Sequence, residues 1–202
     1  SESNYQARLF RSISADPNPA LGGVKEIQCD SFFTPISRES KEQKFFPGSF
    51  AKTTGSLNFQ IRNSFKLSCR FFPTLLFKGV QSLLSISNSS LEINESGYVL
   101  FSYYDKQVIL KQIEISPRKW YEVEGGVSKE GTLSITLKEL SNLKKKYEST
   151  IKFPTKEIPI INDILFVAAK VDAHAPFNFF NGKIEAPCIT ADQTQYQWDF
   201  SK

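Results

Sequence analysis

Apolar and polar residues alternate with a period of two along most of this chain, and turn-forming residues interrupt the alternation about every 8–12 residues. Such alternation places successive side chains on opposite faces of a β-strand, one face buried and the other in water. The pattern predicts about fourteen strands, at Ala7–Ser14, Lys25–Phe33, Gly55–Gln60, Phe65–Phe72, Gln81–Ser87, Leu91–Asn94, Tyr98–Tyr104, Val108–Ile113, Trp120–Ser128, Thr132–Lys138, Lys145–Phe153, Ile164–Val171, Gly182–Ile189 and Gln195–Phe200.

The segments between these strands are rich in residues with special backbone preferences. Proline fixes φ, glycine allows a positive φ, and Asn, Asp and Ser side chains bond to the nearby backbone. No strand–helix–strand unit is recognisable, so we expect an all-β fold, a two-sheet antiparallel jelly-roll sandwich. In this fold the first strand, near Arg8–Ser12, should lie close to the last, near Tyr196–Phe200.

Two segments also carry helical signals. Leu137, Leu140, Leu143 and Tyr147 fall at helical spacing, but the residues before and after them alternate as strands do. We therefore predict a hairpin whose loop is Glu139–Lys144. A short helix is predicted at Ser37–Gln43, where Ser37 is placed to cap the first turn.

Composition is that of one folded domain over residues 1–202. Hydrophobic residues make up 40% of the chain, with 18 Phe, 7 Tyr and 2 Trp to fill a core. The longest apolar run, Ile158–Ala169, is too short and too often interrupted for a transmembrane helix, which needs about 20 apolar residues. The chain begins at Ser1 and contains no Met, which favours an excised piece of a longer protein.

Charge and cysteine usage narrow the function classes. The 25 basic and 21 acidic residues are interspersed except at Lys144–Lys146, so the basic stripe of a nucleic-acid-binding protein is missing. The cysteines Cys29, Cys69 and Cys188 are odd in number and widely spaced, which argues against a zinc site. Cys69 falls on an alternating strand and is expected in the core. This usage favours a reducing compartment and a cytoplasmic location.

Several strand segments together resemble the laminin-G-like, concanavalin-A-like sandwich family. They are an alternating strand that ends in an aromatic residue and Pro, the strand after it, a Trp-containing strand, a Gly-bearing hairpin strand and a late Phe-x-Gly-x-Ile strand. In this sequence they stand at Phe65–Thr74, Gln81–Ser85, Lys119–Val123, Gly131–Ile135 and Phe180–Ile184. The resemblance implies a β-sandwich with an antiparallel jelly-roll topology.

A narrower resemblance is to the non-catalytic sandwich domain of the N,N-dimethylformamidase large subunit. It is carried by Asp16–Pro19, Gly23–Glu26, Pro73-Thr74, Asn181–Pro187 and Trp198–Ser201. In that family a basic residue is expected after Pro187, and this chain has Cys188 there instead. The resemblance implies a domain without an active site or cofactor of its own, whose partners are other domains or subunits of a parent amidohydrolase.

Catalytic motifs are scarce. His174, the only histidine, has Asp172 two residues before it, but no Ser or Cys nucleophile motif accompanies it, so an exposed loop histidine is the favoured interpretation. Concanavalin-A-like folds also include glycosidases, which need two carboxylates in a fixed geometry. Glu122 and Glu124 lie on one strand face about 7 Å apart, and we interpret them as exposed surface residues, with a non-standard glycosidase as one alternative.

Calcium is the only cofactor for which the sequence offers ligands. Ca²⁺ prefers six to eight hard oxygen ligands, and Asp105, Asn162, Asp163 and Asp172 stand at strand ends where loops could supply them. Scattered Asp and Asn residues are also common turn formers, which is the interpretation we favour.

Aromatic residues gather near the C-terminal end, at Phe177, Phe179 and Phe180, and at Tyr103 and Tyr104. Alternation sends Phe177 and Phe179 to one face and Phe180 to the other, so at least one belongs to the core. Trp120 and Trp198 are also expected in the core. With His174, these loop residues are the predicted binding surface of a non-catalytic accessory domain; the alternative is a carbohydrate-binding module that uses the same aromatics.

Overall fold

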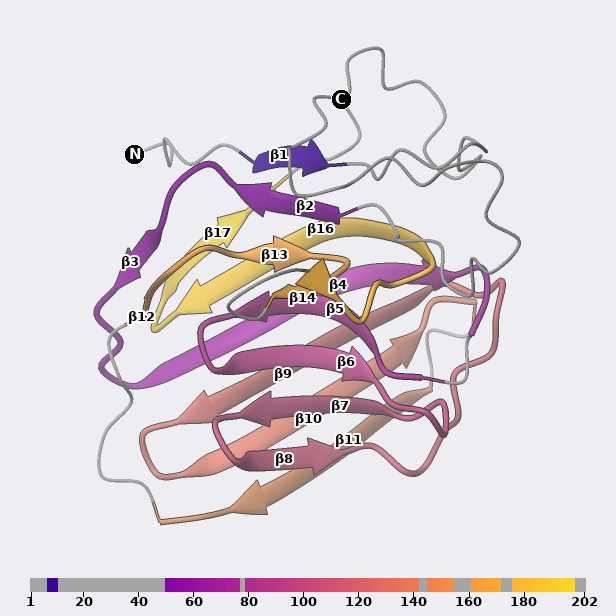
Figure 1. Ribbon diagram of the computed structural model, residues 1–202. Helices are drawn as coiled ribbons and strands as arrows, with labels where there is room; N and C mark the ends of the chain where they lie inside the picture. The colour runs from indigo at the N-terminus through magenta and orange to yellow at the C-terminus, as the bar shows by residue number, and fades with distance from the viewer. Residues whose placement is uncertain are drawn as a thin grey trace.

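The computed structural model describes residues 7–10, 50–76, 79–141, 145–154, 161–171 and 176–198, and these form an all-β sandwich of two main antiparallel sheets (Figure 1). The seven-stranded sheet has the order β1 (Ala7–Phe10), β2 (Phe50–Thr53), β13 (Phe166–Val167), β5 (Gln81–Ile86), β6 (Ser89–Ile93), β7 (Val99–Tyr103) and β8 (Lys106–Ile109). The six-stranded sheet has the order β11 (Lys146–Lys152), β10 (Thr132–Glu139), β9 (Tyr121–Ser128), β4 (Ser64–Pro73), β16 (Gly182–Ala191) and β17 (Thr194–Gln197).

Two short strand pairs complete the described fold. One joins β3 (Leu57–Phe59) to β12 (Ile161–Asp163), and the other joins β14 (Lys170–Val171) to β15 (Pro176–Phe177). The predicted fold class, an antiparallel two-sheet sandwich, is confirmed. Among the described residues no helix is long and apolar enough to cross a membrane.

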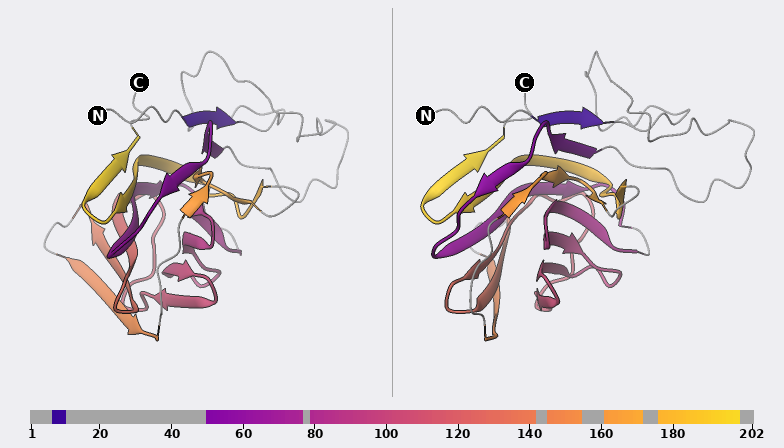
Figure 2. Two further views of the ribbon diagram at one scale, coloured as in Figure 1. Left: turned by 90° about the vertical axis from the view of Figure 1, so that its left-hand side faces the viewer. Right: turned by 60° about the vertical axis from the view of Figure 1, so that its left-hand side comes forward.

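The two sheets pack face to face (Figure 2). Strands β7 and β8 contact β10, and β5 contacts β4, so β1 and β17 are the end strands on the same side of the sandwich. The first and last strands were predicted to lie close together, and both stand at this side. Every second residue of β4, from Phe65 to Phe71, is buried between the sheets. Cys69 is one of them, as predicted, and burial raises the pKa of its thiol.

Some elements differ from the prediction. Strand β2 was not predicted, although it pairs with both β1 and β13. The predicted continuous strand Ile164–Val171 is broken at Ala168, whose φ of 66° turns the chain out of the seven-stranded sheet. Antiparallel pairing of β10 with β11 confirms the predicted hairpin. The strand expected at Lys25–Phe33 and the helix expected at Ser37–Gln43 lie outside the described residues.

Asp192 joins the β16–β17 turn to the corner that precedes β4. Its carboxylate accepts backbone N–H bonds from Asn63 at 2.6 Å, from Ser64 at 3.0 Å and from Arg62 at 3.0 Å. These bonds, that of Asn63 first, hold the pKa of the Asp192 carboxyl below its ordinary value, because they favour the ionised form. The bonds connect segments that lie about 130 residues apart in the sequence.

We expect Asp192→Ala to lower the free energy of unfolding more than Asp192→Asn, because Asn keeps one acceptor oxygen and tolerates the φ of 55°. The Asp192 carboxyl has a lower pKa in the folded than in the unfolded protein, so it stabilises the folded state at pH values above the unfolded pKa. This stabilisation is lost as the pH falls through the folded pKa. The free energy of unfolding, measured in urea from about pH 2 to about pH 6, should therefore fall less steeply toward low pH in both variants than in the natural protein. An equally steep fall in Asp192→Ala would contradict this role.

Candidate binding surfaces

The predicted aromatic loop is divided between two environments. Phe180 is 4% exposed and packs edge-on against Phe71 in the main core, with ring centroids 6.0 Å apart. Phe179 faces the opposite side and contacts Phe50, which also contacts Phe166, in a small separate cluster. One member of the loop is therefore in the core, as the alternation predicted. Phe177 is half-buried in β15.

Tyr103 and Tyr104 lie at the turn between β7 and β8. Tyr103 is only 4% exposed and belongs to the core, and burial, with a smaller effect of Tyr104, raises its pKa to about 12. Tyr104 is 53% exposed, with a φ of 52°. Strand register places Tyr103 opposite Ser89, near the β5–β6 turn, whereas Phe179 forms a bridge to Ser82 near the start of β5. The described structure therefore does not gather the predicted aromatics into one surface.

The predicted calcium ligands are also apart. Asp105 lies in the β7–β8 turn, where the Lys106 ammonium hydrogen bond holds the Asp105 pKa below its ordinary value. Asn162 and Asp163 lie in β12, and Asp163 accepts a bond from the Ile164 N–H. In the part of the chain that the structure describes, no three His, Cys, Asp or Glu side chains are placed to hold a metal ion. Asp172 and His174 lie outside the described residues.

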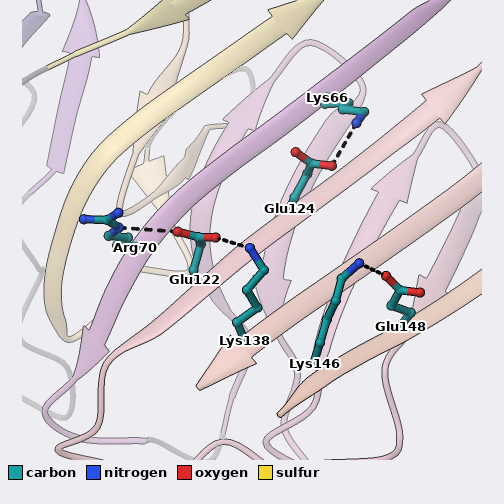
Figure 3. Close-up of polar contacts among 7 residues, drawn as sticks. All are labelled: Lys66, Arg70, Glu122, Glu124, Lys138, Lys146 and Glu148. Atoms are coloured by element: carbon teal, nitrogen blue, oxygen red, sulfur yellow. Dashed lines mark hydrogen bonds and ion pairs between the residues drawn. The ribbon is translucent and has the colours of Figure 1, made fainter. Parts of the chain in front are cut away.

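Charged residues gather instead on the outward side of the six-stranded sheet, which we call the outer face (Figure 3). Strand register sets Lys138, Glu122, Arg70 and Glu185 side by side across β10, β9, β4 and β16. Glu122 accepts from Lys138 at 2.8 Å and from Arg70 at 3.4 Å. Similar exposed pairs link Lys66 to Glu124 and Lys146 to Glu148. Each exposed pair contributes at most about 1 kcal/mol of stability, so the pairs set the pattern of charge more than they stabilise the fold.

These ion pairs bear on the glycosidase alternative. A general acid needs a raised pKa, whereas the hydrogen bond from Lys138, with that from Arg70, lowers the pKa of Glu122. Glu124 is also occupied, by Lys66 at 2.9 Å. Both carboxylates are therefore engaged in surface ion pairs, which supports the favoured interpretation of Glu122 and Glu124.

One end of the outer face is aromatic. Phe72, at the end of β4, lies against Trp120, just before β9, with ring centroids 5.4 Å apart. Both are half-buried, and neither belongs to a core cluster, so the expectation that Trp120 packs in the core is wrong. The neighbouring Tyr121 is the buried residue. Trp198, by contrast, is in the core as expected, at 7% exposed.

A buried ion pair on the opposite sheet was not predicted. Residues 168–171 lie across the outward side of β5 and β6, where Ser85 Oγ donates to the Ala169 carbonyl at 3.0 Å and Lys170 reaches Ser90 and Glu92. There Lys170 Nζ reaches Glu92 Oε1 at 3.3 Å, and the Glu92 side chain is only 8% exposed. Since this segment covers Glu92, Lys170 is the cation that neutralises a carboxylate removed from water.

We expect Lys170→Met to destabilise the domain by about 1–3 kcal/mol, because it leaves the Glu92 carboxylate buried without its cation. Glu92→Gln should cost less, since the Lys170 side chain is 36% exposed and its ammonium can turn to water. Urea unfolding of both single variants and of the double variant measures the coupling between the two residues. The reverse order of the two single variants would contradict the assignment.

Comparison with known proteins identifies the fold. No protein-family model matches the chain, and no curated protein matches its sequence. The structure is similar to the SAP-like pentraxin from Limulus polyphemus, with 12% identity over 68% of this chain and 67% of that chain and a TM-score of 0.50. At this identity the similarity shows the fold alone, an antiparallel β-sandwich of the pentraxin kind.

Two further structures align less closely. Tailspike protein 2 of an Escherichia coli O157:H7 bacteriophage is 12% identical over 69% of this chain and 21% of that chain, with a TM-score of 0.45. Scytalido-glutamic peptidase is 9% identical over 70% of this chain and 81% of that chain, with a TM-score of 0.41. None of the three named proteins is a laminin G domain or a dimethylformamidase, so both resemblances rest on sequence motifs.

Proposed function

We propose that this domain is a non-catalytic interaction module that holds another part of a larger protein against the outer face of its six-stranded sheet. The observation that carries the proposal is the pattern of that face, in which paired charges adjoin a half-buried Trp120–Phe72 pair that contributes to no core. An aromatic contact beside arginine is the composition that protein interfaces favour.

The larger protein, on this proposal, resembles the N,N-dimethylformamidase large subunit. Support for this finer statement is the set of sequence motifs given above, and the sandwich fold is compatible with it. The isolated domain should then show no deformylation of dimethylformamide, and the parent gene should encode a catalytic domain beside it. Measured amidase activity of the isolated domain would refute the accessory role.

Cross-linking tests the surface itself. The full-length natural gene product is treated with an amine-reactive cross-linker, and linked peptides are identified by mass spectrometry. Lys66, Lys138 and Lys146 on the outer face should link to residues outside these 202. Lys106 and Lys111, which lie at and beyond β8 on the other sheet, are the matched controls. Links to outside residues from the control lysines alone would contradict the proposal.

A second candidate function is glycan binding at the same outer face. The observation that favours it is a second row of polar residues across the sheet. Strand register places Thr136 beside Glu124 and Glu124 beside Ser68, and this row lies two residues along the strands from the row that contains Arg70. These hydroxyl and carboxylate groups can bond to sugar hydroxyls, and the aromatic pair lies on the same face four residues along each strand. A glycan array probed with and without calcium tests this candidate, and binding that Trp120→Ala abolishes would favour it over the protein partner.

A further inference from the structure

The aromatic end of the outer face holds apolar side chains that are not packed in a core. Phe72 and Trp120 contact each other, and the Leu140 N–H, just after β10, donates to the Trp120 carbonyl at 2.8 Å. Leu140 is half-buried and, like the aromatic pair, is not packed against a core cluster. Leu75, two residues beyond Pro73 at the end of β4, is 51% exposed. Apolar side chains therefore remain partly in water at one end of an otherwise polar face.

Cations surround this apolar area. Lys183 stands opposite Phe72 in the β4–β16 register, and the Arg118 N–H donates to the Pro73 carbonyl at 2.7 Å. Both side chains are exposed, and among the described residues neither has an acidic partner. Arg70, two residues from Phe72 on the same face, shares only its Nε with Glu122 and is 53% exposed.

The carboxylates at this end do not cancel that charge. Glu122 is bound by Lys138 and Arg70, and Glu139 accepts from Lys119 at 3.1 Å and from Ser141. Glu185 is a third carboxylate at this end, and among the described residues it has no ion pair, as Arg118 and Lys183 have none. The aromatic end is thus apolar at its centre and positively charged at its border.

We infer that the aromatic end binds an acidic polypeptide segment with interspersed apolar side chains, through Trp120 and Phe72 at the centre and Arg118, Lys183 and Arg70 at the border. This inference rests on the proposed function and specifies the chemistry of the partner. Apolar side chains would cover the half-buried rings and Leu140. Carboxylates would pair with Arg118 and Lys183, which have no acidic partner among the described residues, and with Arg70, which shares only its Nε with Glu122. A neutral sugar suits the site less well, because it would leave the cations at the border without counter-charges.

The test uses synthetic peptides and a single fluorescent reporter. The chain has 2 Trp, so Trp198→Phe leaves Trp120 as the only indole. A peptide of about twelve residues that alternates Leu with Glu should shift the Trp120 emission on titration, and the shift should weaken as salt is raised. The same peptide with Lys in place of Glu, and a uronate oligosaccharide, are the comparison probes.

Charge reversal gives the matched variants. Lys183→Glu and Arg118→Glu should each weaken binding of the acidic peptide at least about tenfold, which corresponds to about 1.4 kcal/mol. Lys152→Glu, at the far end of β11 on the same sheet, should leave binding unchanged. No binding of the acidic peptide, equal binding of the Lys peptide, or binding of the uronate alone overturns the inference. The cross-linking experiment tests the proposed function separately, because it detects contact at the outer face with a partner of any chemistry.

Discussion

Phe180→Ala should lower the free energy of unfolding by about 3–5 kcal/mol, the usual cost of removing a buried aromatic ring. Phe180 is 4% exposed, and its ring packs edge-on against Phe71, which in turn stacks on Tyr121 at 5.3 Å. The alanine variant leaves a cavity between two rigid strands, which cannot close around it. Urea unfolding followed by far-UV circular dichroism measures the loss.

Phe179→Ala is the matched control, since it removes the same side chain from the adjacent position. Phe179 is half-buried in the small cluster with Phe50, outside the main core, so its loss should cost only about 1 kcal/mol. Equal losses for the two variants would contradict the division of the aromatic loop into a core residue and an outer residue.

Alternation was sufficient to predict this division and most of the fold. Because successive side chains of an extended segment point to opposite faces, the adjacent Phe179 and Phe180 were predicted to face opposite ways. The predicted common face of Phe177 and Phe179 assumed an extended backbone, whereas Asn178 between them has a φ of 52°. The same parity could have placed Trp120 correctly. Tyr121 and Val123 are buried, so Trp120 must face outward with Glu122. The error came from weighing the size of the indole above its position in the alternation.

Contacts between distant segments explain what the sequence did not predict. Glu92 alternates with Leu91 and Ile93, a pattern that predicts an exposed carboxylate on an outer face. It is buried because a segment some 80 residues later turns at Ala168 and crosses that face. Strand β2 is short, and its place between β1 and β13 depends on pairing that no local pattern specifies. The predicted aromatics Tyr104 and Phe179 are not brought into one surface for the same reason, since their positions depend on strand pairing that the sequence does not show.

Gly182→Ala should be among the most destabilising single substitutions, at about 3 kcal/mol or more, because a Cβ at this position would lie 2.2 Å from the Phe72 carbonyl oxygen. It would also lie 2.7 Å from the Phe180 ring. A backbone oxygen cannot move aside as a flexible side chain can, so the first residues of β16 would have to separate from β4.

A positive φ is not the reason for the glycine in the Asn181-Gly182 pair. The pair is typical of a turn that needs positive φ, but Gly182 is the first residue of β16 and is paired with Pro73, and its φ is not positive. Close approach of two backbones therefore explains the glycine. Gly55→Ala is the control, since a Cβ there meets nothing within 4 Å and a smaller loss of chain entropy should leave stability equal or slightly higher. Thermal unfolding of the two variants should differ widely in midpoint, and similar midpoints would show that β4 and β16 can separate at little cost.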